Sequence, residues 1–553
     1  MPMIDIQWAF TKGMIDAKGR NKIPAYFAGY VRNARIRNGS ITNRFWPRTF
    51  WNLWDTPIRQ LHRNDGELLA IAWGILYKLV PWPVAVRGTV GTATQQYTMI
   101  SQGKYTLILN GTDAPRVYSR STGLFNSAVT GAWPNSWPNT LPYGNSWDPW
   151  LQNPEPLIGA SITGFTFIAG NQSSNNHILY ISKPVLPETP ENAYNRSLTA
   201  TGGTWGSLSD QEAYDVGRNR HMTSEILAMT SNLDNVYIFC RESIEMISRN
   251  NVETFGSYYN LATIPIGDGD QIAWVHASCV AGQKVFFFTK SLHVKTIWYA
   301  EWKAYPLIGD LSDRQGQEIR EFMRQNLDDD QSKSFAFFNK EQNTIEFHLR
   351  SNESNGKNDI TLIYDLVHDT FVVDNNKEYS CATRWGNNGL RMYAGDYTTG
   401  QVYLDYIDKF DEISWWFQEP TPFEYNTPNI ALWNPAIEKQ FRWFTLCWAM
   451  NANTTLEITC YIDGREEFTK TITRNDIYPT EIQAITIGWD EDFNAGTNKF
   501  HPFEYVADQG MLRKKGKRIR IKIKAERSWQ EFYLDSLAID AVATGWYELN
   551  DKF

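Results

Sequence analysis

The chain has 553 residues, of which 42% are hydrophobic, 21% charged and 14% aromatic, so its composition excludes global disorder. Its 53 Lys and Arg against 61 Asp and Glu give a formal net charge of −8, which excludes a general attraction to nucleic acid. The length predicts two or three packed units. The five cysteines are odd in number and lack CxxC spacing, which argues against a disulfide framework and a zinc site and predicts folding in a reducing compartment.

The first residues lack a basic segment followed by a long apolar one, so we expect no secretory signal. The most apolar long window, Leu68 to Val86, is interrupted by Lys78, Pro81 and Pro83. A bilayer span needs roughly 20 mostly apolar residues. We therefore predict no membrane-spanning segment.

Residues 1–64 form the first predicted unit, a basic hairpin or platform segment. Tyr26 to Arg48 contains five arginines and no acid, around the tight-turn signal Asn38-Gly39. Such a hairpin is either a solvated face or a surface that meets a partner or DNA, and the arginine density favours the second. The arginines are Arg32, Arg35, Arg37, Arg44 and Arg48.

Short apolar runs separated by turns recur from residue 65 to 411 and predict a series of β-hairpins. The central hairpin consists of the predicted strands Ala273–Val280 and Val285–Thr289, with the turn Gly282-Gln283-Lys284 between them. Further predicted strands are Tyr97–Ile100, Lys104–Leu109, Phe165–Ala169, His177–Ser182, Glu225–Thr230, Val236–Cys240 and Ile244–Ser248, followed by Phe335–Phe338, Thr344–Leu349, Ile360–Asp365, Thr370–Val373, Leu390–Ala394 and Gln401–Leu404.

Two details within this region carry specific expectations. Asp310 to Asn326 has helical spacing of apolar residues and predicts a helix with Ser312 as N-cap. In Thr344–Leu349 the aliphatic and aromatic residues alternate with Glu346 and His348, which predicts one face toward the core and one toward solvent.

A loose segment at about 119–156, rich in Asn, Gly, Ser and Pro, interrupts the repeats and predicts an insertion. Its tryptophans could stack on sugars or dock against a neighbouring subunit. Docking is favoured because no polar cluster accompanies the rings. The candidate docking residues are Trp133, Trp137, Trp147 and Trp150.

Residues 412–553 are predicted to be a separate antiparallel sandwich, because the strands become longer. The predicted strands are Thr455–Ile462, Glu466–Thr473, Lys517–Lys524 and Phe532–Ala541. The third lies in a segment with nine basic residues and one acid, Met511–Arg527. Either it is a charged sheet edge that blocks aggregation, or it is a basic wall facing DNA or an acidic partner. Its cations Arg518, Arg520, Lys522 and Lys524 alternate with three isoleucines.

The chain carries no HExxH, P-loop or GxSxG motif, so we expect no enzyme activity, no cofactor and no metal site. The eight histidines are scattered, and an ordinary structural role is expected for each. The run Asp328-Asp329-Asp330 is interpreted as a solvated turn, because three consecutive acids do not project toward one point.

Modules of roughly 40–60 residues predict an all-β fold with a β-propeller of six or seven blades and a C-terminal antiparallel β-sandwich. An array of β-sandwiches is the alternative. Five blocks occur in order along the chain: NARIRNGSITNRFWPR, DNVYIFCRESIEMISRNN, VFFFTKSLHV, MYAGDYTTGQVYLDY and KRIRIKIKAERSWQEFYLDSLAID. Together they resemble the tail hub or nozzle proteins of short-tailed bacteriophages, also called packaged-DNA stabilisation proteins.

The resemblance implies a structural virion protein assembled in the bacterial cytoplasm. Such a protein forms a ring of six below the portal and adaptor, holds tail fibres or spikes, touches the genomic DNA transiently and conducts it during ejection. The candidates for the DNA channel or the adaptor contact are then Arg32, Arg35, Arg37, Arg44, Arg518, Arg520, Lys522 and Lys524. The alternatives are a glycan-binding or glycan-cleaving propeller of a tailspike or receptor-binding protein, and a propeller scaffold of cellular origin; sugar affinity as a monomer would favour the first.

Overall fold

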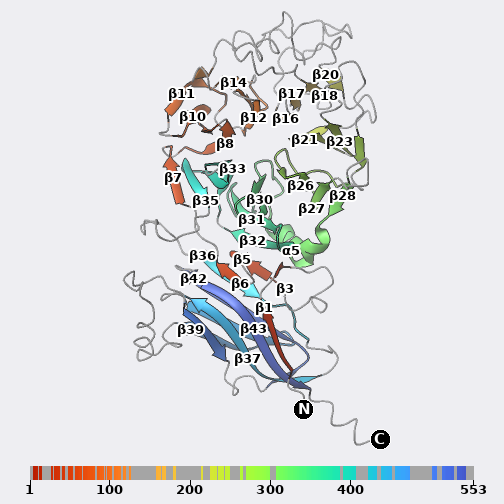
Figure 1. Cartoon of the computed structure of the whole chain (residues 1–553), viewed down its shortest axis with the longest axis vertical. Helices are drawn as coiled ribbons and strands as arrows, with labels where there is room; N and C mark the ends of the chain where they lie inside the picture. The colour runs from red at the N-terminus through yellow and green to blue at the C-terminus, as the bar shows by residue number, and fades with distance from the viewer. Residues whose placement is uncertain are drawn as a thin grey trace, which may run out of the picture.

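The computed structural model describes residues 4–14, 27–64, 66–125, 157–181, 213–215, 225–248, 262–405, 421–473 and 501–543, with short gaps inside these ranges. Nearly all of its regular structure is β. Six separate four-stranded sheets, together with the first four strands of an eleven-stranded sheet, make seven similar sets among the described residues. Figure 1 shows these sets around a common centre, with a second unit below them.

Each set is an antiparallel array in which hydrogen bonds join the first strand to the second, the second to the third and the third to the fourth. Set 1 contains β8 (Ile58–Asn64), β9 (Glu67–Ala72), β10 (Ile75–Lys78) and β11 (Val84–Thr89). Set 2 contains β12 (Thr98–Gln102), β13 (Tyr105–Leu109), β14 (Arg116–Ser119) and β15 (Leu124–Phe125). Set 3 contains β16 (Ile158–Ile162), β17 (Phe165–Ala169), β18 (Ile178–Ile181) and β20 (Ala213–Asp215).

Set 4 contains β21 (Ile226–Ser231), β22 (Asn235–Cys240), β23 (Ser243–Ser248) and β24 (Ala262–Pro265). Set 5 contains β25 (Ser278–Ala281), β26 (Lys284–Phe288), β27 (Val294–Trp298) and β28 (Leu307–Asp310). Set 6 contains β29 (Phe335–Asn339), β30 (Thr344–Arg350), β31 (Asn358–Asp365) and β32 (Thr370–Asn375). Set 7 contains β33 (Tyr379–Trp385), β34 (Arg391–Asp396), β35 (Gln401–Asp405) and β7 (Arg48–Asn52).

The sets follow one another in space as they do along the chain. The first strand of each set contacts the first strand of the next, from β8 through β12, β16, β21, β25 and β29 to β33, and β33 contacts β8. The outermost strand of the last set is β7, which comes from the N-terminal part of the chain and pairs with β35.

Most of the predicted hairpins are confirmed. The turn between β25 and β26 places Gly282 at a φ of 62°, a conformation that glycine adopts without steric cost. The strand predicted before this turn, Ala273–Val280, is shorter than expected, since β25 begins only at Ser278. Upstream of it, Ile272 forms an isolated bridge to Thr289. Of the segment predicted as an insertion, Leu124–Phe125 form β15, which pairs with β14, whereas residues 126–156 lie outside the described residues.

The one described α-helix, α5 (Ser312–Asn326), matches the predicted helix in its C-terminal end. Its N-cap is Leu311, which has no side-chain hydrogen bond, so the predicted Ser312 cap is wrong. Ile319 and Met323 are 2% and 1% exposed and belong to the main hydrophobic core, so the helix is held by packing on its apolar face.

The second unit is built from strands of both chain ends. The eleven-stranded sheet continues from set 6 through β4 (Tyr30–Arg32), β36 (Thr421–Asn426), β42 (Ile519–Ser528), β38 (Thr455–Ile462) and β39 (Arg465–Thr473), with β2 (Lys12–Met14) and β3 (Phe27–Ala28) beside it. A seven-stranded sheet contains β40 (His501–Val506), β37 (Lys439–Met450), β43 (Phe532–Ala543), β6 (Ser40–Asn43), β5 (Ala34–Arg37), β1 (Ile4–Ala9) and β41 (Lys514–Gly516).

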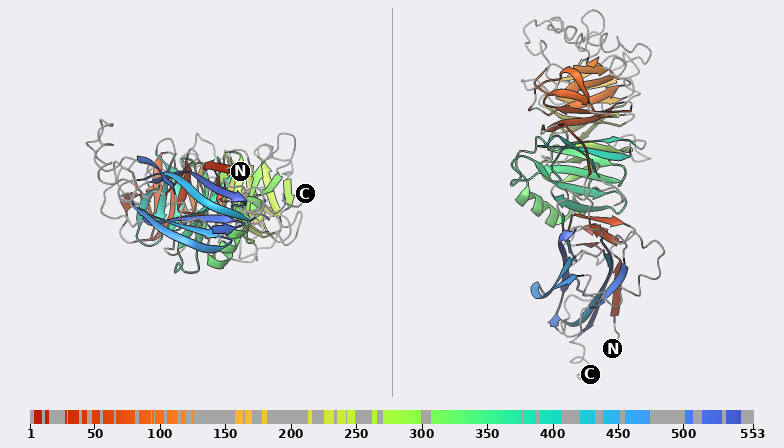
Figure 2. Two further views of the ribbon diagram at one scale, coloured as in Figure 1. Left: turned by 90° about the horizontal axis from the view of Figure 1, so that it is seen from below. Right: turned by 90° about the vertical axis from the view of Figure 1, so that its left-hand side faces the viewer.

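Residues 1–64 therefore contribute to several sheets. The predicted hairpin around Asn38-Gly39 is confirmed as β5 paired with β6, and β6 pairs with β43 near the other end of the sequence. Strand β8 of set 1 also begins within this segment, at Ile58. Figure 2 shows the resulting elongated molecule, with the sets at one end and the second unit at the other.

Candidate functional site at the charged junction strands

Strand β42 has the alternation that its sequence predicts. Ile519, Ile521 and Ile523 are fully buried, whereas the four cations between and beside them are partly exposed. The interpretation of β42 as a charged sheet edge is wrong, because β36 pairs with one side of it and β38 with the other. A central strand exposes no row of unpaired backbone groups, so its charges are not needed to block an edge.

The charged face that contains these cations is mixed rather than uniformly basic. Across β4, β36, β42 and β38, four residues lie directly opposite one another in register and alternate in charge. The row consists of Arg32, Glu424, Lys524 and Glu457. Opposite charges on neighbouring strands stabilise a sheet, so part of the basic character is used within the chain.

Two contacts next to this row use further cations. The Lys522 ammonium lies 2.9 Å from a Glu424 carboxylate oxygen, with the side chains 22% and 20% exposed. The Arg520 guanidinium lies 4.3 Å from the centre of the Tyr461 ring, within the range of a cation–π contact. We name this face, from Arg32 to Arg520, the junction face.

Three further sequence-predicted candidates lie at other positions in the two sheets. Arg35 and Arg37 belong to β5 in the seven-stranded sheet, and Arg518 directly precedes β42 in the eleven-stranded sheet. The backbone N–H groups of Lys517 and Arg518 donate to the Asp463 carboxylate at 3.0 and 2.9 Å, which fixes the turn before β42. Arg44 and the tryptophans Trp133, Trp137, Trp147 and Trp150 lie outside the described residues.

Sequence reasoning missed a buried ionic cluster between set 6 and set 7. The Lys377 ammonium lies 3.0 Å from Asp405, 3.7 Å from Asp374 and 3.7 Å from Glu346. All four side chains are at most 3% exposed. Lys377 follows β32 and precedes β33, so the cluster lies where the chain passes from one set to the next.

The two-faced exposure predicted for β30 is therefore wrong. Glu346 and His348 are both 0% exposed, as are Ile345, Phe347 and Leu349. Phe347 packs against Phe288 of set 5, whereas His348 packs against Tyr379 of set 7. A strand with a neighbouring set on each side buries both faces, whatever its own alternation.

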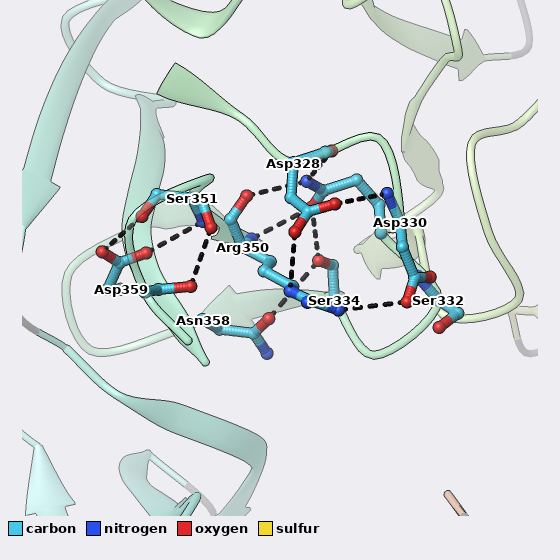
Figure 3. A network of polar contacts seen from close by, with 10 residues as sticks. Asp328, Asp330, Ser332, Ser334, Arg350, Ser351, Asn358 and Asp359 are labelled. Atoms are coloured by element: carbon cyan, nitrogen blue, oxygen red, sulfur yellow. Dashed lines mark hydrogen bonds and ion pairs between the residues drawn. The ribbon is translucent and has the colours of Figure 1, made fainter. Parts of the chain in front are cut away.

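The acidic run at 328–330 forms a turn that is held by ion pairs to Arg350 (Figure 3). Asp328 and Asp330 each bind the Arg350 guanidinium, at 3.1 and 3.0 Å. Hydrogen bonds from Ser332 and the charge of Arg350 hold the pKa of Asp330 below its usual value. The predicted solvated turn is confirmed: Asp329 and Asp330 are exposed, and Asp328 is 27% exposed.

No group of His, Cys, Asp or Glu with the geometry of a metal site occurs among the residues that the structure describes. Within the same residues, no helix is long and apolar enough to cross a membrane. Burial raises the pKa of the free thiols of Cys240, Cys381 and Cys460 to about 12, which keeps them protonated at neutral pH.

No family model and no curated protein matches the chain. Among solved structures, it is similar to the computationally designed Ika8 protein, with 10% identity over 65% of this chain and 99% of that one and a TM-score of 0.34. It is also similar to YCF48 from Cyanidioschyzon merolae, with 9% identity over 65% and 98% and a TM-score of 0.39. A third is PorZ, a surface component of the type-IX secretion system of Porphyromonas gingivalis, with 9% identity over 72% and 44% and a TM-score of 0.36. Likenesses at these TM-scores assign no function to the chain.

Proposed function

We propose that the seven sets form a closed seven-bladed β-propeller and that the second unit is a β-sandwich. The contact between β33 and β8 and the pairing of β7 with β35 support closure, because they join the last set to the first set and to the N-terminal strand. Buried residues of both sheets of the second unit, such as Ile539 and Ile521, belong to one core, which supports the sandwich.

We further propose that the protein is a structural subunit of a tail hub or nozzle of a short-tailed bacteriophage. In this function it is a virion protein that assembles as a homohexameric ring below the portal adaptor. The ring carries fibres or spikes, retains the packaged DNA and conducts the genome during ejection. The sequence blocks that resemble this family lie in the propeller sets and in the second unit, so the proposal covers both parts.

The observation that carries the proposal is the continuity of the eleven-stranded sheet. Hydrogen bonds run from β29 in set 6 through β4 to β39 in the second unit, and β4 pairs with both β32 and β36. A shared sheet resists rotation between two units far better than a flexible linker does. A subunit of this kind suits a ring whose channel must keep its geometry under load.

The junction face favours a protein partner over DNA as its ligand. A surface that grips DNA neutralises phosphates with unpaired cations, whereas Lys522 and Glu424 are already paired and Lys524 lies opposite two acids in register. Mixed charges are typical of a protein interface that must select one partner and one register. We therefore assign the junction face to the adaptor contact.

Mass photometry of the purified chain, alone and with the adaptor protein, tests the hub function. We expect a particle of about six chains that encloses a channel in negative-stain images. A chain that stays monomeric with its adaptor present would overturn the proposal. A monomer that binds a glycan array would support the glycan-binding alternative instead.

Cross-linking of the intact tail tests the assignment of the junction face separately. We expect Lys522 and Lys524 to cross-link to the adaptor. A reversed variant, Lys522→Glu, should weaken the adaptor complex, whereas Lys357→Glu, at a similarly exposed lysine of set 6 that pairs with Glu378, is the control for loss of an ion-paired lysine outside the junction face. Cross-links that arise only from the propeller sets would contradict this assignment.

A further inference from the structure

Two arginines occupy matching positions on the strands that meet between set 7 and set 1. Arg384 is the second-to-last residue of β33, and Arg63 is the second-to-last residue of β8. These are the first strands of their sets, and they contact each other. Arg63 is exposed, and Arg384 is partly buried.

Hydrogen bonds join β33 to β8 near both ends of the two strands. At the start, the Ser380 hydroxyl donates to the Ile58 carbonyl. At the end, the Trp385 indole N–H donates at 2.9 Å to the carbonyl of Gly66, in the turn that follows β8. The strands therefore run side by side in the same direction, and the ends that carry the two arginines lie together.

The Arg384 side chain is held over an aromatic ring. Its guanidinium carbon lies 5.6 Å from the centre of the ring of Phe338, the second-to-last residue of β29 in set 6. Such a ring contacts a face of the guanidinium and takes none of its five N–H donors. The contact with Phe338 therefore positions Arg384 and leaves its donors available to a ligand.

Neither arginine forms an ion pair or a hydrogen bond within the part of the chain that the structure describes. The titratable groups that act on Arg384 are Arg63 and the Cys279 thiol. Burial lowers the pKa of the Arg384 guanidinium, and the positive charge of Arg63 lowers it further. Burial raises the pKa of the Cys279 thiol, which is therefore uncharged at neutral pH. Two positive charges thus lie at one end of the seam with no carboxylate acting on Arg384.

The matching positions of sets 2 and 3 show what a satisfied polar residue looks like here. Ser101 and Ser161 are the second-to-last residues of β12 and β16. The Ser161 hydroxyl donates to the Ser101 carbonyl at 3.2 Å, and the Ser101 hydroxyl lies 2.6 Å from His62 Nε2. Both serines use their hydrogen-bonding groups within the chain, whereas Arg63 and Arg384 keep theirs for a ligand.

We propose that Arg63 and Arg384 together bind a phosphate group, either free phosphate or the terminal group of a phosphomonoester. One guanidinium satisfies a planar carboxylate with two parallel N–H bonds, whereas two guanidinium groups match a tetrahedral anion with more oxygens and two negative charges. The bound anion contacts set 7 and set 1 at once and stabilises the folded chain. This inference does not depend on the proposed hub function.

Isothermal titration calorimetry of the full chain with inorganic phosphate, in low-salt buffer at pH 7, tests the proposal. We expect saturable binding. Arg63→Gln and Arg384→Gln should each weaken it about tenfold or more, because each removes charge-assisted hydrogen bonds. Arg384→Lys keeps the charge but loses the planar fork, so its affinity should lie between those of the wild type and Arg384→Gln.

Arg241→Gln is the matched control, since Arg241 is also an exposed arginine but already pairs with Glu225 at 3.0 Å. This variant should bind phosphate as the wild type does. Arg63→Gln changes an exposed side chain and keeps the test valid if Arg384→Gln fails to fold.

A second titration with methyl phosphate distinguishes the two sources of the phosphate group. A phosphomonoester site binds methyl phosphate as well as phosphate, whereas a site for free phosphate excludes the substituent; either result supports the proposal. Absence of saturable phosphate binding by the wild type would overturn it, and so would equal affinity in the wild type and Arg63→Gln. An equal loss in Arg241→Gln and Arg63→Gln would indicate a general charge effect and would also overturn it.

Discussion

Strands β30 and β42 have the same alternation of aliphatic and ionisable residues but opposite environments. In β42 the cations lie on a partly exposed face and have acids opposite them on neighbouring strands. In β30 the ionisable residues Glu346 and His348 are completely buried against set 7. The alternation therefore determines which residues share a face, and the neighbouring sheets determine whether that face meets water.

Removal of the buried Lys377 ammonium should give the largest effect in this comparison. Lys377→Met removes the ammonium that lies 3.0 Å from Asp405 and 3.7 Å from both Asp374 and Glu346, and breaking a buried ion pair from one side costs roughly 3–5 kcal/mol. Urea unfolding of the full chain measures this loss. Lys357→Met removes the partly exposed partner of Glu378 and should cost at most about 1 kcal/mol. Equal losses of stability in both variants would mean that burial does not distinguish the two ion pairs.

Truncation of the apolar face of β42 should have the next largest effect. Ile521→Ala removes a fully buried side chain from the core of the second unit and should destabilise it by about 3 kcal/mol. Thermal unfolding measures the change, with Thr471→Ala on the exposed part of β39 as the control. If Ile521→Ala unfolds as the wild type does, the two faces of β42 are not energetically distinct.

Acid should affect the region of the seven sets through histidines that are kept neutral. Burial lowers the pKa of His62 and His276 to about 4, from an ordinary value near 6.5. The unfolded chain binds more protons between these values, so stability is complete above pH 6.5 and is lost as pH falls toward 4. His62→Gln should reduce this acid sensitivity in unfolding measurements at stepwise pH. An unchanged pH profile in His62→Gln would show that His62 is charged or exposed in the folded chain.

The smallest effect is expected at the junction face itself. Lys522 and Glu424 are about one-fifth exposed, and pairs that retain solvent contact contribute roughly 0–1 kcal/mol. A double-mutant cycle with Lys522→Ala and Glu424→Ala should give a coupling in this range that weakens with salt. A coupling free energy as large as the stability loss in Lys377→Met would mean that the ion pair at the junction face contributes as much as the buried cluster.

Local chemistry determined much of the secondary structure. Turn residues separated by short apolar runs predicted the hairpins of sets 2 to 7, and the spacing of Ile319 and Met323 predicted helix α5. The isoleucines of β42 predicted its buried face. These features are readable because they depend on residues close together in the sequence.

The tertiary structure alone decided which segments meet. Strand β7 completes set 7, and β4 joins set 6 to the second unit, although hundreds of residues of sequence separate the partners. For the same reason the sequence did not predict that Glu346, Lys377 and Asp405 form one cluster, or that acids of β36 and β38 lie beside the cations of β42. A side chain's own strand sets the direction in which it points, but its burial and charge partners come from sheets that fold beside it.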